Sequence, residues 1–218
     1  TATEPEFLEA HKQLIESAYI LHINGRHRKL MRSAMAVAKE VGTIISLDGG
    51  AQRYDEDMKP ITEASHIVIV ARDYAEKYTG TTNLEDACRI IHERGAFIAG
   101  VTDGANGSYF VWPDGTSYRC EPFSQATVVD TTGAGDSFHG AFLYMLTKTL
   151  CKIADGTNTS TMNETSQSLN AIDLLHSCAH EDLEKAATFA SAVAALNTQG
   201  IGGRSPLPSL EDIKALIG

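Results

Sequence analysis

Basic residues are scarce in this 218-residue sequence, which has 18 Lys and Arg against 28 Asp and Glu. The resulting net charge of −10 argues against a surface that binds the nucleic-acid backbone. Apolar residues make up 43% of the chain but form no run long enough to span a bilayer. No secretory signal is visible after Thr1. We therefore expect no nucleic acid, no membrane and a cytoplasmic location.

Cysteine is also rare, and no two cysteines form a Cys-x-x-Cys pair. We interpret the four as reduced thiols, at Cys88, Cys120, Cys151 and Cys178. His176 and His180 lie at helical i, i+4 spacing around one of them, which makes a metal site conceivable. A surface helix face is the favoured interpretation, because no further ligand motif lies nearby.

Two common phosphate-binding motifs are missing. No Lys-Ser or Lys-Thr pair follows a glycine loop, which excludes a Walker A motif, and the glycine spacing does not fit a Rossmann fingerprint. The chain instead has one continuous stretch of small residues from Val129 to Ala141. A β-rich run, Ala126 to Val129, leads into it, and a helical run from about Ser137 to Lys148 leads out.

The chemistry of this stretch suggests phosphoryl transfer. Successive N–H groups of Gly133, Ala134, Gly135 and Asp136 at a helix N-terminus can bind phosphate oxygens. The Asp136 carboxylate could take a proton from an attacking hydroxyl. An anion cradle with a base suits transfer from a nucleotide to an alcohol. A simple Asp-capped helix start is the alternative.

The remaining pattern alternates strands with helices, which predicts a parallel sheet with helices on both faces. The expected strands are Tyr19 to Ile23, Thr43 to Asp48, His66 to Val70 and Ala96 to Val101, followed by a hairpin of Ser108 to Trp112 and Thr116 to Cys120. The expected helices are Glu4 to Ser17, Arg28 to Glu40, Met58 to Ala64, Asn83 to Arg94, Glu181 to Leu196 and Leu210 to Ile217. We predict one nucleotide-binding α/β domain, residues 1–218, with a flexible polar insertion at 155–168.

The stretch Asp130-Thr131-Thr132-Gly133-Ala134-Gly135-Asp136, followed by Phe138, Gly140 and Ala141, resembles the second signature of the ribokinase-like (PfkB) carbohydrate kinases. His22 to Arg26 and Gln199 to Gly203 resemble the ketohexokinase-like branch. The resemblance implies a three-layer α/β/α ribokinase-like fold with a mainly parallel central sheet. It also implies that the N-terminal strands and lid of the family are missing, so we expect a fragment.

The resemblance assigns roles by position. Asp136 would be the catalytic base, and the amides of Gly133, Ala134 and Gly135 would complete the anion hole. Asp130 and Thr132 would lie near a monovalent-cation site, such as one for K⁺. ATP would contact a turn and a helix end, formed by Thr102, Asp103, Gly104, Gly107 and Asn197. The alternatives are a plain polar turn for the first four and a helix C-cap for Asn197.

One departure concerns magnesium. Many relatives carry Asn-x-x-Glu after the third strand, where this chain has Ala71 to Tyr74. Ketohexokinase-like members have an Asp near this position, so the resemblance assigns the Mg²⁺ role to Asp73. A solvent-facing Asp at a helix start is the alternative. The absent N-terminal part would also carry most sugar-binding residues, and an exposed sheet edge would favour association, for example as a homodimer.

The sequence thus favours an ATP- and Mg²⁺-dependent kinase that phosphorylates a hydroxyl of a small-molecule sugar. A nucleoside kinase of the adenosine type, with the same fold, is the first alternative. A non-catalytic nucleotide-binding pseudokinase or fragment is the second, favoured by the altered Ala71 to Tyr74 segment. A structural α/β module without a ligand would require the whole signature to be coincidence.

Overall fold

The computed structural model describes residues 4–123, 127–160, 170–204 and 207–218. Within them, six strands form one sheet in chain order, with β1 to β4 parallel and the β5–β6 hairpin antiparallel. The strands are β1 (Ile20–Ile23), β2 (Ile44–Gly49), β3 (Ile67–Ala71), β4 (Ile98–Thr102), β5 (Ser108–Val111) and β6 (Ser117–Cys120). The four parallel strands therefore end at the same edge of the sheet, where ligands bind in many α/β proteins.

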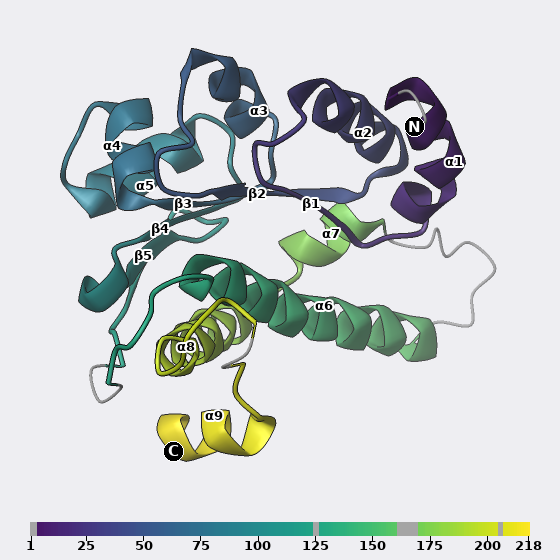
Figure 1. Cartoon of the computed structure of the whole chain (residues 1–218). Helices are drawn as coiled ribbons and strands as arrows, with labels where there is room; N and C mark the ends of the chain where they lie inside the picture. The colour runs from purple at the N-terminus through teal and green to yellow at the C-terminus, as the bar shows by residue number, and fades with distance from the viewer. Residues whose placement is uncertain (1–3, 124–126, 161–169, 205–206) are drawn as a thin grey trace.

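Helices cover both faces of the sheet, giving three layers (Figure 1). The first face carries α1 (Glu4–Glu16), α2 (Arg28–Val41), α3 (Lys59–Glu63), α4 (Arg72–Thr79) and α5 (Leu84–Glu93), with a 3₁₀ turn, η1 (Glu56–Met58), before α3. The second face carries α6 (Ala134–Ser160), α7 (Ala171–His176) and α8 (His180–Asn197), with α9 (Leu210–Ile217) packed against α8. A second 3₁₀ turn, η2 (Gly104–Asn106), joins β4 to β5.

Alternating side chains of the buried strands supply the core on both faces. In β3, Ile67 and Ile69 pack towards α6 and α8, whereas Val68 and Val70 pack towards α2 to α5. This two-residue period is what a strand imposes, and apolar residues at both parities mark a strand covered on both faces. The β5–β6 hairpin adds Phe110, which stacks on the rings of its core neighbours.

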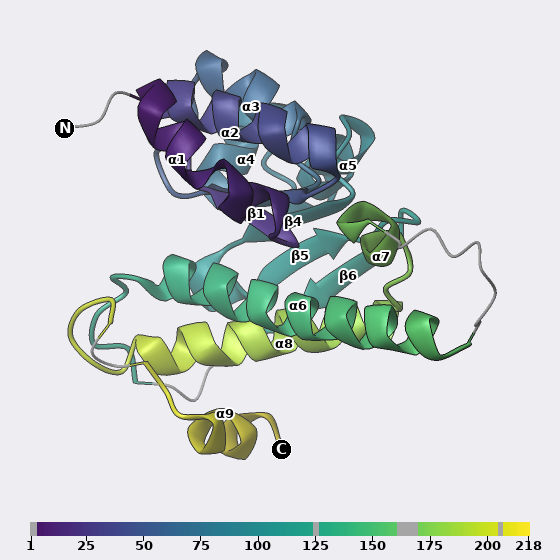
Figure 2. The ribbon, with the colours of Figure 1, turned by 90° about the vertical axis from the view of Figure 1, so that its right-hand side faces the viewer.

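The second face is built on the pair α6 and α8, which run side by side (Figure 2). Buried Phe138, Phe142, Leu146 and Leu150 recur on α6 at four-residue spacing, as expected of a helix stripe that faces a sheet. The buried face of α8 consists mostly of small residues, such as Ala186, Ala187 and Ala190, and lets the two backbones approach closely. This packing fixes where α6 begins.

Most predicted elements are confirmed, including the parallel strands, the hairpin and the six predicted helices, to within two residues. The helix that leaves the signature loop is longer than predicted, because it begins at Ala134 and continues to Ser160. The first six residues of the predicted insertion at 155–168 are therefore helical, since α6 continues beyond the core contacts of Ile153 and Ala154. Residues 161–169 lie outside the described residues, so the flexibility of the insertion stays a prediction.

Three other expectations need correction. Residues 127–129 form no strand, because their backbone pairs with the end of α8 rather than with another strand, while Ala126 lies outside the described residues. Helix α7 was not predicted, and α4 was expected only as the helix start in the alternative for Asp73. His176 and His180 do not share a helix, since His176 ends α7 and His180 begins α8. His176 packs against Phe97, and His180 pairs with Asp114.

Among the described helices, none combines the length and apolar character that crossing a membrane requires.

Candidate active site

The start of α6 is the centre of the candidate site. The first hydrogen bond within α6 runs from Ser137 N–H to Gly133 C=O, at 2.8 Å. Ala134 N–H is taken up by Thr131 C=O, but the N–H groups of Gly135 and Asp136 precede the first intrahelical bond and are left available by helix geometry. Asp136 is exposed in the same turn. The turn can therefore present N–H donors and a carboxylate to one ligand.

Gly133 lets this turn approach another loop closely. Its φ of +80° is a left-handed conformation, and a Cβ added there would lie 2.5 Å from the Cα of Gly203. The two glycines are thus in backbone contact across a large sequence separation. The signature loop and the glycine loop after α8, both noted in the sequence, are brought together by this contact.

Asp130 joins the same two loops through its carboxylate. Its Oδ1 accepts from Thr132 N–H at 2.9 Å, and its Oδ2 accepts from Gly202 N–H at 2.8 Å. These backbone donors hold the pKa of Asp130 below its usual value. Val129 and Asp130 also donate to Thr198 C=O at the end of α8. We call residues 127–136 together with 198–203 the helix-start segment.

Asn197, the last residue of α8, is fully buried, and neither polar atom of its side chain has a hydrogen-bond partner among the described residues. The C-cap of α8 is Thr198, so the C-cap alternative for Asn197 does not hold. A buried amide without partners is costly. The unpaired Asn197 side chain is consistent with a ligand contact that forms after neighbouring groups move. The assignment of Asn197 to the nucleotide stays a prediction.

The predicted nucleotide turn forms where β4 ends. Thr102 is the last residue of β4, and Gly104 and Gly107 flank η2 with positive φ. Asp103 accepts from Arg72 Nη1 at 3.0 Å and from Asn106 Nδ2 at 3.0 Å. Asp103 also lines a cleft of about 610 Å³ whose other walls come from α5 and the β5–β6 hairpin. Since residues 133–136 do not line that cleft, the cleft does not define the candidate site.

Asp73 lies at the start of α4, where its Oδ2 accepts from Gln52 N–H at 2.6 Å. Gln52 has a left-handed backbone, with φ +60°, so this bond holds a strained residue in the loop after β2. The structure places Asp73 on this loop and Asp130 and Thr132 in the helix-start segment. No cluster of three or more His, Cys, Asp or Glu that could hold a metal occurs in the described parts of the chain.

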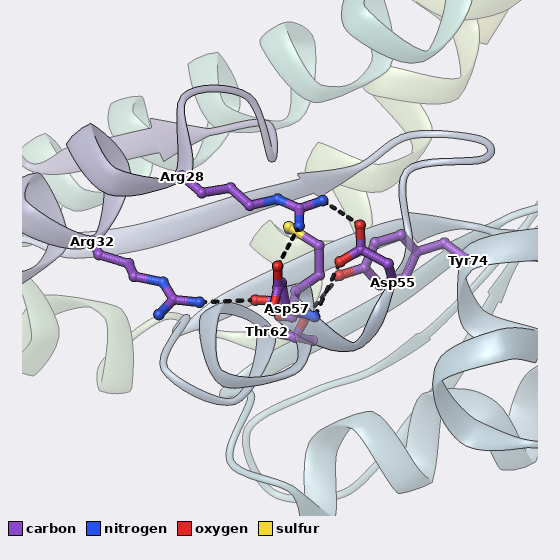
Figure 3. Close-up of polar contacts among 7 residues, drawn as sticks. Arg28, Arg32, Asp55, Asp57, Thr62 and Tyr74 are labelled. Carbon is purple, nitrogen blue, oxygen red and sulfur yellow. Dashed lines mark hydrogen bonds and ion pairs between the residues drawn. The ribbon is translucent and has the colours of Figure 1, made fainter.

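A charged clamp holds the loop after β2 against α2 (Figure 3). Arg28 pairs with Asp55 and with Asp57, the latter at 3.2 Å, and Arg32 donates to Asp57 C=O. Underneath, Thr62 and Tyr74 share a buried hydroxyl hydrogen bond of 2.7 Å, and burial raises the pKa of Tyr74 to about 12. We call residues 24–25, 49–57 and 72–73 the strand-end loops.

Several polar residues that we did not assign to the site meet where these two regions adjoin. Asp48, near the end of β2, is buried and lies 3.4 Å from Arg53 Nη1 and 3.7 Å from His139 Nε2. His22 on β1 contacts the Ser46 hydroxyl at 3.2 Å. In the sequence, Asp48 is recognisable as a charged residue inside an apolar strand. His139 has no comparable sequence feature, because it simply lies within the apolar stripe of α6.

The two histidines are electrostatically coupled. His22 keeps an exposed face on the outer strand, yet loss of water around its ring lowers its pKa. The neighbouring charge of His139 lowers that pKa further, while Asp48 and Asp136 act in the opposite direction. Asp136, Asp48 and the histidines therefore form one electrostatic group at the sheet edge.

The sequence matches a known protein family over nearly its whole length. The model of the pfkB family carbohydrate kinases matches residues 1–210. A 5-dehydro-2-deoxygluconokinase of Shouchella clausii is 23% identical over 93% of this chain and 57% of its own length, and a probable fructokinase-5 of Arabidopsis thaliana is 28% identical over 96% and 61%. The chain thus spans about three fifths of these relatives.

Solved structures show the same fold. A ribokinase from Giardia lamblia superposes with a TM-score of 0.69 at 18% identity, covering 97% of this chain and 63% of its own. A fructokinase from Vibrio cholerae, in a form with fructose, ADP and calcium bound, gives 0.68 at 21% identity, covering 92% and 61%. The fold is therefore ribokinase-like, and from its sequence the chain belongs to the pfkB family of carbohydrate kinases.

Proposed function

We propose that the protein transfers the γ-phosphate of ATP to a hydroxyl group of a sugar. The observation that carries this proposal is the first turn of α6, where the exposed Asp136 carboxylate stands beside N–H groups that have no intrahelical acceptor. The family and the fold support it, because pfkB relatives include fructokinases and ribokinases. The choice of a sugar over a nucleoside is part of the proposal, as is the link to the ketohexokinase-like branch.

In this proposal Asp136 takes the proton from the acceptor hydroxyl as the hydroxyl oxygen attacks the γ-phosphorus. The bond between the γ-phosphorus and the β,γ-bridging oxygen breaks, and ADP leaves with the electron pair. The N–H groups of Gly135 and Asp136, at the positive end of the α6 dipole, stabilise the charge that develops on the phosphoryl oxygens. The contact between Gly133 and Gly203 fixes the backbone from which these donors project. Catalysis then depends on position and charge more than on covalent chemistry.

The nucleotide would lie across the helix-start segment, from the amides of α6 to the end of α8. Asn197 supplies a buried amide with unused hydrogen-bonding capacity. Thr102, Asp103, Gly104 and Gly107 would border it from the end of β4. Mg²⁺ prefers oxygen ligands, and we propose the Asp73 carboxylate as the protein group on the Mg²⁺ side of the site. When bound, Mg²⁺ would neutralise phosphate charge. K⁺ near Asp130 and Thr132 remains a proposal of the same kind.

The decisive experiment replaces Asp136 by Asn in the intact protein that carries this chain. ADP release is followed with a panel of hexoses, pentoses and nucleosides, and ATP affinity is measured by calorimetry. We expect kcat to fall by about 10²- to 10⁴-fold, because only the base is removed. ATP affinity should stay close to normal, since the amides remain. A sugar-dependent rate with the unmodified protein, absent with nucleosides, supports the sugar assignment.

Asp86→Asn is the matched control, because Asp86 lies in the first turn of another helix, α5. It should leave the rate unchanged. Near-normal turnover by Asp136→Asn would refute Asp136 as the base. ATP binding without turnover on any acceptor would favour the non-catalytic nucleotide-binding protein instead.

A further inference from the structure

His139 lies at the junction between the start of α6 and the sheet, with both ring nitrogens facing carbonyl oxygens. Nδ1 is 2.8 Å from Gly135 C=O, and Nε2 is 3.1 Å from Ile69 C=O on β3. A carbonyl oxygen can only accept a hydrogen bond. A neutral imidazole carries one N–H, so either neutral tautomer would direct a lone pair at one of these oxygens. Only the imidazolium donates to both.

The surroundings can balance the resulting charge. The Asp48 carboxylate lies 3.7 Å from Nε2, and both side chains are buried. Asp48 and Ile69 are register partners on adjacent strands, which places an acidic group and an acceptor carbonyl on the same side of the ring. Among the described residues, Asp48 also pairs with Arg53, at 3.4 Å. A buried carboxylate is stable only when paired, so the pair with His139 is mutually favourable.

Every titratable or charged neighbour of His139 can be placed. Asp48 faces it from β2 and His22 from β1, while Asp136 lies one turn earlier on α6 itself. β3 contributes only the Ile69 carbonyl. Arg53 influences the His139 ring indirectly, because it pairs with Asp48. Burial lowers the pKa of His22, which disfavours its charged form. Among the described neighbours, the two acidic groups therefore outweigh the Arg53 guanidinium.

The bond to Gly135 has a consequence for the anion hole. The C=O of Gly135 belongs to the same peptide unit as the N–H of Asp136, one of the donors in the proposed function. A cation that donates to the carbonyl side of a peptide polarises it and strengthens the N–H on the other side. The same bond fixes the orientation of that peptide plane. His139 therefore acts on the phosphoryl oxygens through one peptide unit without touching them.

We propose that His139 is a positioning residue held as an imidazolium, which ties the Gly135–Asp136 peptide to β3 and strengthens the Asp136 N–H as an anion-hole donor. The effect on rate rests on the proposed function, whereas the charge state of the ring does not. Because this role needs a protonated ring, kinase activity should decrease at alkaline pH. Activity needs the protonated ring, so kcat falls as pH rises through the midpoint of His139.

The charge state is tested by NMR on the chain labelled with ¹⁵N in its histidines. We expect both nitrogens of His139 to be protonated at neutral pH, because both face carbonyl oxygens. His11 is the internal control, because its Nδ1 makes the same contact with a carbonyl four residues earlier but at an exposed position. Asp48→Asn removes the counter-charge and should lower the His139 midpoint. A singly protonated His139 at neutral pH would overturn the proposal.

The effect on rate is tested in the intact protein with His139→Asn, which keeps an amide donor but no charge. We expect kcat to fall about 10- to 100-fold with KM for the sugar nearly unchanged, and the alkaline limb of the pH profile to disappear. In the unmodified protein that limb should coincide with the NMR midpoint. An unchanged kcat and profile would overturn the role in catalysis. If the variant fails to fold, the coincidence of the two midpoints in the unmodified protein decides.

Failure here can be told apart from failure of the proposed function. If Asp136→Asn keeps its activity, the base assignment falls, but the histidine spectrum still reports whether the ring is charged. If the spectrum shows a neutral ring while Asp136→Asn is inactive, only the role of His139 is lost.

Discussion

The two sides of the candidate site are held in place by different forces. The strand-end loops are fixed by charged side chains: Arg28 with Asp55 and Asp57, and Asp73 on the backbone of Gln52. The helix-start segment is fixed mainly by backbone contacts, such as that of Gly133 with Gly203, and by one carboxylate that accepts two N–H groups. Surface ion pairs are weak and sensitive to salt, whereas close backbone packing tolerates no added atom. The difference predicts how each side responds to substitution.

The largest effect is expected from Gly133→Ala. The new Cβ would meet the Gly203 backbone at 2.5 Å in a left-handed conformation that alanine disfavours. Strain and overpacking together should cost about 2–5 kcal/mol of unfolding free energy. We also expect ATP affinity to fall, because the α6 amides must shift. Urea unfolding and calorimetry measure the two quantities.

Gly140→Ala is the matched control on the same helix, since a Cβ there meets nothing within 4 Å. It should be neutral or stabilise by up to about 1 kcal/mol, through helix propensity. If Gly133→Ala is as well tolerated as Gly140→Ala, the backbone contact does not fix the helix-start segment.

Asp130→Asn should have an intermediate effect on the same segment. An amide has one acceptor oxygen, so one of the N–H groups of Thr132 and Gly202 would face an NH₂ group instead. We expect the melting temperature to fall by roughly 2–6 °C at neutral pH, with no dependence on ionic strength. Differential scanning calorimetry at low and high salt measures this.

The pH dependence of the same variant gives a further check. Hydrogen bonds from Thr132 and Gly202 lower the pKa of Asp130 from 3.8 in the folded state. Its contribution to stability is therefore present above the unfolded pKa and is lost as pH falls through the folded pKa. The difference in melting temperature between the natural protein and Asp130→Asn should shrink as the solution is acidified below about pH 4. A difference that grows on acidification would contradict the assigned bonds.

These contrasts show what the sequence could predict. The anion cradle, which stays a prediction, could be proposed from the sequence because Gly133 to Asp136 are contiguous and form a recognisable motif. The strands were found because Ile67 to Val70 alternate between two buried faces. The β-branched residues before Asp130 suggested a strand but have no partner strand, and propensity cannot supply one. The end of α6 was misplaced because Asp155 to Ser160 is polar, yet continues a helix that is already packed.

The parts that were missed depend on pairs distant in sequence. The residues next to His139 in the sequence do not distinguish it from other polar residues on a helix. Its proposed role depends on contacts with Ile69 and Asp48, which lie on two different strands. The need for Gly203 likewise appears only once Gly133 lies against it. In both cases a residue of the signature region contacts a residue elsewhere in the chain. A motif search can find the signature residue, but it does not identify the distant partner.

The smallest effect is expected from Arg28→Gln in the strand-end loops. Arg28 is the only residue in Figure 3 that pairs with both Asp55 and Asp57, but these pairs are largely exposed. We expect a fall in melting temperature of roughly 1–3 °C at low salt, because exposed ion pairs contribute little. The fall should vanish at about 1 M salt, where the Debye length is near 3 Å. Amide hydrogen exchange should quicken in residues 49–58, because the clamp joins this loop to α2.

Arg89→Gln is the control for this last variant, since the acidic partners of Arg89, Glu85 and Asp86, lie on its own helix α5. It removes a comparable exposed charge without untying two elements, so exchange in residues 49–58 should not change. If Arg28→Gln leaves exchange there unchanged as well, the clamp does not hold the loop. If instead its effect persists at high salt, packing of the arginine stem rather than charge fixes the strand-end loops, and the contrast with the helix-start segment is one of degree.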